Sequence, residues 1–383
     1  MRCRPQLAAA RRRLYRTSGT SALALLACAA ACAGPAGAAG YVDGISDQSL
    51  PAWDGSFATS RFAALFRERW SGRRERQITL ARYVVQWNAM SEATTGPHAT
   101  GNYRERFEAW LLDARTLALT PVLALTSYDG VHPASPAEYR RQLEAILAGA
   151  AALGYPIADV EPWNEPNGQG HESALAAAQL ADAAASVCVQ PQVCSVIAGD
   201  FEDRSSLPAF EQAYERALTF TPSIWGVHPY VSVRAHNDAR LRRLIRELPA
   251  HGAGQRIWFT EVGALYCAHG EVRGQARQAS DASYLTGTLL ADPGVAPEHA
   301  FYYGFLFGGG ALAPCTPAGG EDSELYSGSD QPRLAAQVIL RPPRATTPAA
   351  EAAAGEWPPW SPAASAMIEA LPDAQGRNPE QRP

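Results

Sequence analysis

The 383-residue sequence contains no lysine, so arginine and histidine supply every basic side chain. This absence excludes Schiff-base catalysis, attachment of pyridoxal phosphate and the lysine of a phosphate-binding loop. We also find no glycine fingerprint of dinucleotide binding, no Gly-x-Ser-x-Gly elbow of serine esterases and no His-Glu-x-x-His spacing of zinc hydrolases. We therefore expect that the protein uses no metal and no organic cofactor.

The N-terminus has the composition of an export signal. Arg11, Arg12 and Arg13 precede an apolar run, Ser21–Ala33, which is too short to favour a membrane-spanning helix, and Ala36-Gly37-Ala38 follows. We predict a signal peptide over residues 1–38 and a secreted protein. A twin-arginine signal and a lipid anchor on Cys28 are the alternatives. No later stretch is apolar enough to span a bilayer.

The charge of the remaining chain is acidic. Residues 1–38 hold six arginines and no acidic residue, so their removal changes the formal net charge from −5 to −11. A nucleic-acid partner selects the opposite sign. We therefore expect no nucleic acid and a neutral or weakly charged ligand.

Four of the seven cysteines lie beyond the predicted signal, an even number in an oxidising compartment. Cys188 and Cys194 flank a Gln-Pro turn, and we predict that they form a disulfide. Cys267 and Cys315 then form a second. Free, buried thiols are the alternative, and the spacings do not resemble a zinc site.

Eight short apolar runs alternate with helical patterns along the chain. The runs are apolar throughout rather than at every second residue, which indicates strands buried on both faces. Eight strand–helix units predict a (β/α)8 barrel over residues 39–372, with a disordered tail at 373–383. An open doubly wound sheet is the alternative. The predicted strands are Tyr41–Ser46, Thr79–Trp87, Thr120–Ser127, Ile157–Trp163, Val193–Asp200, Ser223–Tyr230, Arg256–Glu261 and His299–Phe305.

Apolar stripes at helical spacing predict the helices between these strands. Ser135-Pro136-Ala137-Glu138 has the form of a capping box at the start of one of them. The predicted helices are Arg61–Trp70, Tyr103–Ala114, Pro136–Leu147, Ala174–Val187, Pro208–Leu218, Leu241–Leu248, Ala279–Leu290 and Ser361–Leu371.

Two glutamates occur where strands of the predicted barrel end. Glu165 follows the fourth run, and Glu261 ends the seventh. The active sites of such barrels lie at the carboxyl ends of the strands, so both side chains should face one site. Two carboxyl groups are what cleavage of a glycosidic bond requires. This interpretation requires that the two carboxylates converge and that neither is locked against a guanidinium group.

The sequence around Glu165 resembles a known family. Glu161-Pro162-Trp163-Asn164-Glu165-Pro166-Asn167 is similar to the strand-four signature of the clan A retaining glycoside hydrolases, with families 39 and 5 the nearest. The resemblance implies that Glu165 is the acid/base and that Asn164 binds the sugar 2-hydroxyl. It also implies that Glu261 is the nucleophile. His228 and Tyr230 match the strand-six His-x-Tyr, whose tyrosine orients the nucleophile.

The sequence departs from this family at two places. Members often carry a tryptophan at the end of strand eight, where this chain has Tyr303-Gly304-Phe305-Leu306-Phe307, and an arginine near the end of strand two, where it has Gln86-Trp87-Asn88. Arg82 comes early in that strand. Trp87 and Tyr128 are candidates for stacking on a sugar face, and Asp129 is a candidate for binding hydroxyl groups.

The predicted activity is hydrolysis of a β-linked oligo- or polysaccharide with retention of configuration. The two carboxyl groups of a retaining enzyme lie about 5–5.5 Å apart. We expect Glu165 to start protonated, Glu261 to be ionised, and Glu161 to point into the barrel and orient its neighbours. A transglycosylase and a catalytically silent carbohydrate-binding barrel are the alternatives. We expect a monomer.

Overall fold

The computed structural model describes the central part of the chain and a few flanking segments. The described residues are 42–47, 78–91, 103–128, 130–168, 172–188, 194–248, 256–268, 270–304, 315, 321–327 and 331–340. The predicted signal peptide, the C-terminal tail and the helices predicted at Arg61–Trp70 and Ser361–Leu371 lie outside them.

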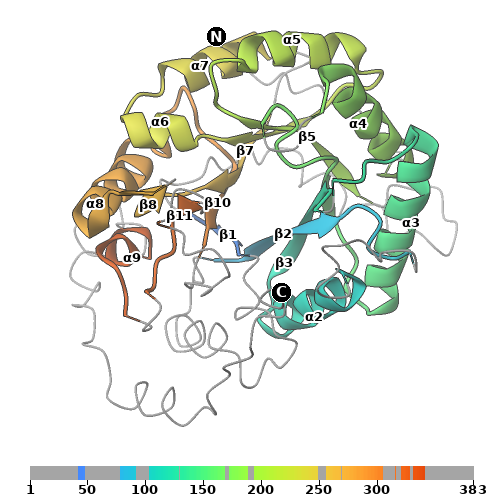
Figure 1. The fold of residues 1–383 in the computed structure, drawn as a ribbon, viewed down its shortest axis with the longest axis horizontal. Coiled ribbons are helices and arrows are strands. Elements are labelled where there is room, and N and C mark those ends of the chain that lie inside the picture. The colour runs from blue at the N-terminus through green and yellow to red at the C-terminus, as the bar shows by residue number, and fades with distance from the viewer. Residues whose placement is uncertain are drawn as a thin grey trace, which may run out of the picture. The chain divides into compact units, whose positions relative to one another are not determined.

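Eight parallel strands close into a barrel, as the sequence predicts (Figure 1). Neighbours around the barrel follow the order β1-β10-β7-β6-β5-β4-β3-β2, with every pairing parallel. The strands are β1 (Gly44–Ser46), β2 (Leu80–Gln86), β3 (Thr120–Thr126), β4 (Asp159–Glu161), β5 (Ser195–Glu202), β6 (Ile224–His228), β7 (Arg256–Val262) and β10 (His299–Tyr303).

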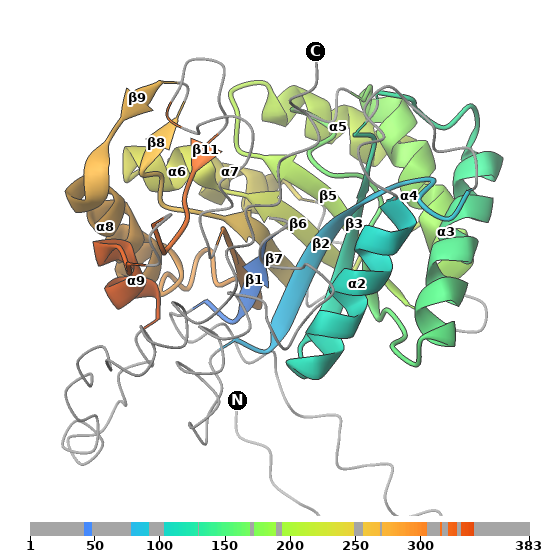
Figure 2. The same cartoon turned by 60° about the horizontal axis from the view of Figure 1, so that its bottom comes forward.

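Helices lie outside the barrel strands (Figures 1 and 2). They are α2 (Tyr103–Thr116), α3 (Pro136–Ala152), α4 (Ala174–Cys188), α5 (Leu207–Ala217), α6 (Tyr230–Ala235), α7 (Ala239–Glu247), α8 (Gly274–Tyr284) and α9 (Leu334–Ile339). The hydroxyl oxygen of Ser135 accepts a hydrogen bond from the backbone N–H of Glu138, as the capping motif predicts. The Glu138 carboxylate reaches back to the N–H of Ala134 instead of that of Ser135.

The inside of the barrel has an apolar layer beneath a charged one. Leu80, Val122, Ile197, Ile224, Trp258 and Phe301 form a separate buried cluster, one residue from each of six strands. Side chains two residues apart share a face of a strand, so Arg82 follows Leu80 and His228 follows Ile224 at the next levels. Both of these charged side chains are fully buried. The charged layer therefore sits toward the carboxyl ends of the strands.

Several elements differ from the sequence prediction. The predicted fourth strand shortens to Asp159–Glu161, and Tyr230 begins helix α6 instead of ending a strand. The helix predicted at Ala279–Leu290 starts earlier, at Gly274, and continues after Tyr284 as a π-helix, Leu285–Leu289. A small sheet of β8 (Cys267–Ala268), β9 (Glu271–Val272) and β11 (Glu321–Asp322) has no counterpart in the prediction (Figure 2).

Both predicted disulfides are confirmed. Cys188 bonds to Cys194 after helix α4, and Cys267 in β8 bonds to Cys315. Among the helices of the described segments, none has the length and apolar character needed to cross a bilayer.

Candidate active site

Glu165 lies in the loop that follows β4. The backbone N–H of Asn164 still bonds to the carbonyl oxygen of Leu125 in β3 at 2.7 Å, so the loop leaves the sheet only at Glu165. Glu165 has φ 47°, in the left-handed region that non-glycine residues rarely adopt. Such strain is typical of functional residues that the surrounding structure holds in place. The side chain is 8 % exposed.

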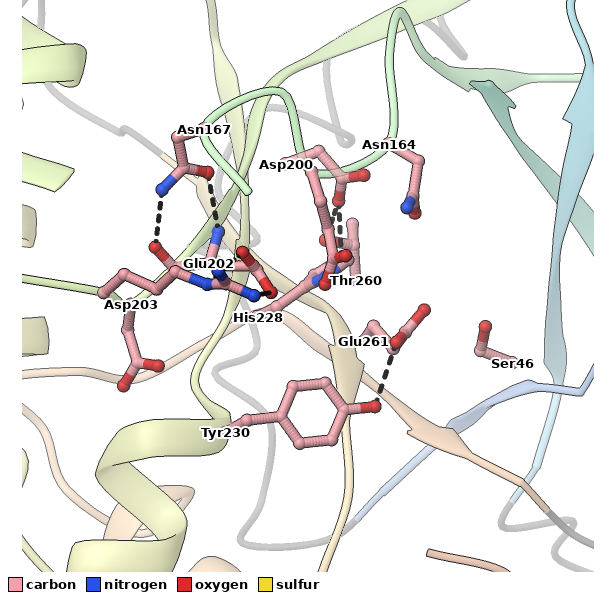
Figure 3. A network of polar contacts seen from close by, with 12 residues as sticks. Ser46, Asn164, Asn167, Asp200, Glu202, Asp203, His228, Tyr230, Thr260 and Glu261 are labelled. Carbon is pink, nitrogen blue, oxygen red and sulfur yellow. Dashed lines mark hydrogen bonds and ion pairs between the residues drawn. The ribbon is translucent and has the colours of Figure 1, made fainter. Parts of the chain in front are cut away.

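Glu261 projects from the carboxyl-terminal part of β7. Its Oε1 accepts a hydrogen bond from the Tyr230 hydroxyl at 2.9 Å (Figure 3). Asp203, after β5, accepts hydrogen bonds from the N–H groups of Val231 and Ser232 at 2.8 and 2.6 Å. The Asp203 carboxylate thus caps the first turn of α6, the helix that begins with Tyr230, and holds that tyrosine beside Glu261.

The two predicted carboxylates converge. One carboxylate oxygen of Glu165, one of Glu261 and one ring nitrogen of His228 all lie within 4.8 Å of one another. Ninety-six positions separate the two glutamates in sequence. They meet because β4 and β7 are strands of one closed parallel barrel, whose carboxyl ends all lie at one rim.

Arg82 contradicts two expectations from the sequence. One is that strand two brings no arginine to the site, and the other is that no guanidinium group pairs with either glutamate. Although it comes early in β2, its side chain reaches Glu261 Oε2 with Nη1 at 2.7 Å and Asn164 Oδ1 with Nη2 at 2.7 Å. The requirement that neither glutamate is held by a guanidinium group therefore fails for Glu261. Arg82 contacts one Glu261 oxygen and Tyr230 contacts the other, so the case for this glutamate depends on its convergence with Glu165. Position along the strand was a poor guide because an arginine side chain spans several residues of strand length.

The Arg82 charge is shared among three carboxylates. Its Nε and Nη2 also donate to Glu161 at 3.0 and 2.8 Å, and Nη2 donates to Asp200 at 3.0 Å. Glu261 therefore competes with two other carboxylates for one positive charge. Arg82 binds its Oε2, and its Oε1 accepts a hydrogen bond from Tyr230. Such a pairing favours the ionised form of Glu261 and leaves one oxygen oriented by a neutral donor.

His228 bridges two acidic residues. Its Nδ1 lies 2.8 Å from Glu165 Oε1, and its Nε2 lies 2.7 Å from Asp200 Oδ1. Burial alone lowers the pKa of His228, but the charges of Asp200 and Glu261 outweigh burial and raise it well above its ordinary value. The two acidic neighbours therefore favour the cationic form of the imidazole.

Burial in this layer also shifts the acidic groups. It raises the pKa of Glu261, against the lowering effect of His228 and Arg82. It raises the pKa of Glu161 to about 8, again against Arg82. Burial acts in the same direction on Asp200, but the charges of His228 and Arg82 outweigh it and lower the pKa of that residue. Glu161 and Asp200 therefore titrate as one coupled group rather than as two independent acids.

Two acidic residues of the site were missed in the sequence. Asp200 lies in β5 and is fully buried; an acidic residue inside an otherwise apolar run was the available signal. Glu202 ends β5, and its backbone N–H and carbonyl oxygen both bond to the Asn167 side chain (Figure 3). Burial and the charge of Glu165 raise the pKa of Glu202 to about 7. A Cβ at Gly168 would lie 1.5 Å from Glu202 Oε2, so a larger residue there would displace the Glu202 carboxylate.

The donor set does not favour a metal ion. Glu161, Asp200 and His228 form one triad with ligand atoms within 4.8 Å, and Glu165, His228 and Glu261 form another. The Arg82 guanidinium already bonds to both triads, through Glu161, Asp200 and Glu261. A divalent cation would face this fixed positive charge, so these residues fit acid–base chemistry better than metal binding.

The two aromatic side chains predicted to contact sugar differ in exposure. Tyr128 is 46 % exposed, although its hydroxyl donates to the carbonyl oxygen of Val84 at 3.0 Å. Trp87 is 3 % exposed and its indole N–H donates to the carbonyl oxygen of Val131, so it packs the loop and presents little surface for stacking. Asp129 lies outside the described residues. Tyr303 stands at the end of β10, where the family places tryptophan, and burial together with the charge of Glu261 raises its pKa.

No family model matches the sequence, and no curated protein matches it. Several solved structures do match it. SrfJ from Salmonella typhimurium is 13% identical with a TM-score of 0.54, covering 80% of this chain and 75% of its own. The GH39 enzyme from Xanthomonas axonopodis pv. citri is 13% identical with a TM-score of 0.53, covering 80% and 67%. The Ignisphaera aggregans GH53 catalytic domain is 14% identical with a TM-score of 0.54, covering 79% and 96%. At these identities the likeness shows the fold, and at that level it confirms the resemblance to glycoside hydrolases.

Proposed function

We propose that this protein is a retaining glycoside hydrolase that cleaves a β-linked oligo- or polysaccharide without a cofactor. The observation that carries the proposal is the convergence of the Glu165 and Glu261 carboxylate oxygens to within 4.8 Å. An inverting pair stands about 6.5–9.5 Å apart to admit a water, whereas a retaining pair stands about 5–5.5 Å apart. Because 4.8 Å bounds the distance between one oxygen of each carboxylate, it is compatible with the retaining separation, and we take direct attack by one carboxylate as the mechanism.

The environments of the two glutamates support different roles. Glu261 has one oxygen paired with Arg82 and the other fixed by the Tyr230 hydroxyl, the setting of an oriented, ionised nucleophile. Glu165 has no arginine or lysine partner among the described residues and contacts His228 through Oε1. This leaves Oε2 for the proton that the leaving oxygen receives.

The reaction then follows in two displacements. Glu165 protonates the glycosidic oxygen while Glu261 attacks the anomeric carbon, and the bond to the leaving group breaks. Glu165, now a carboxylate, removes a proton from water, which attacks the same carbon and releases Glu261. Two inversions restore the starting configuration. Asn164 is placed beside Glu165 for the sugar 2-hydroxyl, and the exposed ring of Tyr128 is a candidate sugar platform.

The proposal predicts that Glu261 becomes glycosylated. A panel of 2,4-dinitrophenyl 2-deoxy-2-fluoro-β-glycosides of glucose, xylose, galactose and mannose should label the peptide that contains Glu261, as read by mass spectrometry. Glu261→Gln should lower hydrolysis of the corresponding aryl glycosides by roughly 10⁴-fold or more. Glu144→Gln, an exposed site on α3, is the matched control and should behave as wild type.

The first product seen by proton NMR should be the β-anomer. A first product of α configuration contradicts retention, and unchanged turnover in Glu261→Gln contradicts the assignment of the nucleophile. Product analysis with an added sugar acceptor separates hydrolysis from transglycosylation. Sugar binding with neither labelling of Glu261 nor turnover would favour a binding barrel.

Export is part of the proposal. The two disulfides suit an oxidising compartment, and the N-terminal sequence has the pattern of a signal peptide. N-terminal sequencing of the protein secreted by an expression host should begin near residue 39. A mature chain that begins at Cys28 would instead show lipid attachment.

A further inference from the structure

Asp200 occupies an unusual backbone position in β5. Its φ is 55°, and the preceding Gly199 also has a positive φ of 88°. The pairing of β5 with β6 shifts register between Gly199 and Phe201, which marks a β-bulge. Left-handed backbone at a non-glycine residue is strained and persists at sites where the surroundings fix it.

The bulge places the Asp200 carboxylate against His228. Asp200 Oδ1 lies 2.7 Å from His228 Nε2 and accepts from the Thr260 hydroxyl at 2.6 Å (Figure 3). Gly226 in β6 makes room for this packing, because a Cβ there would lie 3.2 Å from the Asp200 Cα and 3.0 Å from Thr260 Oγ1. The contact is fully buried on both sides.

We propose that Asp200 is a positioning residue for Glu165 that acts through His228. The inference rests on the proposed function. A neutral imidazole carries one N–H and can donate to only one of its two carboxylate neighbours, whereas an imidazolium donates to both. Asp200 accepts a hydrogen bond from the Nε2–H group of the imidazolium. This contact fixes the ring so that Nδ1–H donates to Glu165 Oε1. The proton for the leaving group then resides on Glu165 Oε2.

Charge balance gives Asp200 a second effect on the same pair. An imidazolium by itself would place a buried positive charge next to Glu165. The Asp200 carboxylate offsets that charge, so His228 orients Glu165 without acting as an isolated cation. The charged and titratable groups that face His228 are Asp200, Glu165, Glu261, Glu202, Glu161 and Arg82.

NMR provides a test that needs no substrate. Long-range ¹H–¹⁵N spectra of histidine-labelled protein, with the His228 signals identified by their loss in His228→Gln, report the protonation of both ring nitrogens. Wild-type His228 should carry both protons at pH 8. Asp200→Asn should shift its deprotonation down by at least one pH unit. A neutral His228 in the wild type at pH 7, which can be read even if the variant does not fold, overturns the proposal.

Leaving-group dependence tests the action on Glu165. The dinitrophenyl group needs little protonation on departure, whereas phenol needs it. Both substrates carry the sugar that the panel identifies. Asp200→Asn should lower kcat/KM for the phenyl β-glycoside roughly 100-fold. It should lower kcat/KM for the 2,4-dinitrophenyl β-glycoside by no more than about threefold. Thr260→Val removes the other hydrogen bond to the same Asp200 oxygen without changing charge, and its ratio of the two rates should match wild type.

Equal losses on both substrates, or a His228 titration that Asp200→Asn leaves unchanged, overturn the proposal. A wild type that hydrolyses none of the glycosides contradicts the proposed function, while the NMR result still decides whether Asp200 sets the state of His228.

Discussion

The Tyr230 hydroxyl holds one oxygen of Glu261, and its removal should change the pH dependence of the reaction. Burial raises the pKa of Glu261, while the hydrogen bond from Tyr230 lowers it. Tyr230→Phe should therefore raise that pKa further and move the acidic limb of kcat/KM upward by about 1 pH unit, since a hydrogen bond to a charged group contributes about 1.5 kcal/mol or more. Steady-state rates across pH 4–8 give the measurement.

Tyr139→Phe is the matched control for that substitution. Its buried hydroxyl donates to the backbone carbonyl oxygen of Pro162 at 2.6 Å and touches no carboxylate among the described contacts. The variant should lose stability but keep the wild-type acidic limb. A Tyr230→Phe profile that keeps the wild-type limb would show that the hydroxyl does not set the ionisation of Glu261.

Single residues show where sequence reasoning worked and where it failed. The convergence of Glu165 and Glu261 could be predicted because strand ends can be recognised from apolar runs, and barrel geometry brings those ends together. The contacts of Arg82 could not be predicted from its early position in the strand, because its long side chain reaches residues nearer the carboxyl end of the barrel. Trp87 was expected at a sugar, but an aromatic residue after a strand gives no signal of which way its ring turns.

Helix α5 contains a carboxylate pair that should make stability depend on pH. Burial, with the charges of Glu215 and Glu247, raises the pKa of Glu211 to about 8, and burial raises that of Glu215 to about 7. An unfolded glutamate titrates near its ordinary value of about 4.3, so the folded protein binds more protons at neutral pH. These groups should therefore make stability fall as pH rises from about 4.5 to about 8.

Glu211→Gln removes the larger of these two effects. The variant should be more stable than wild type by about 1 kcal/mol or more at pH 9. The difference should be much smaller at pH 4.5, where the carboxyl group is protonated in the folded wild type and about half protonated in the unfolded chain. Urea unfolding at the two pH values gives the measurement, with exposed Glu144→Gln as the control. An equal change at both pH values would mean that the Glu211 carboxyl does not titrate in this range.

At the level of elements, long regular segments were predictable and short irregular ones were not. The strand runs and the helix opened by Ser135 follow local patterns of apolar spacing and capping. Strands β8, β9 and β11 are two residues each and pair through loops distant in sequence, so no local period marks them. The bulge at Asp200 depends on packing against β6, which local sequence does not encode.

Two disulfides cross-link the chain, and they close loops of different length. The Cys267–Cys315 bond closes 48 residues and the Cys188–Cys194 bond closes 6. On loop-closure entropy alone, removing the first costs about 4 kcal/mol and removing the second about 2 kcal/mol. Cys267→Ser/Cys315→Ser should therefore unfold at a lower urea concentration than Cys188→Ser/Cys194→Ser.

Reduction of the wild type should reproduce the loss seen when both pairs are replaced. If the two double variants are equally stable, or the short loop matters more, the constraint on the unfolded chain is not the source of the stabilisation.

The Arg82 guanidinium pairs with Glu161, Asp200 and Glu261, so these four positions should covary in evolution. Replacement of Arg82 leaves three buried carboxylates without its charge, and replacement of one carboxylate leaves N–H groups of the buried guanidinium without their acceptor, so single substitutions are penalised. Homologues should keep the whole set or exchange several members at once, and the order in which such exchanges are tolerated would record the history of this barrel's chemistry.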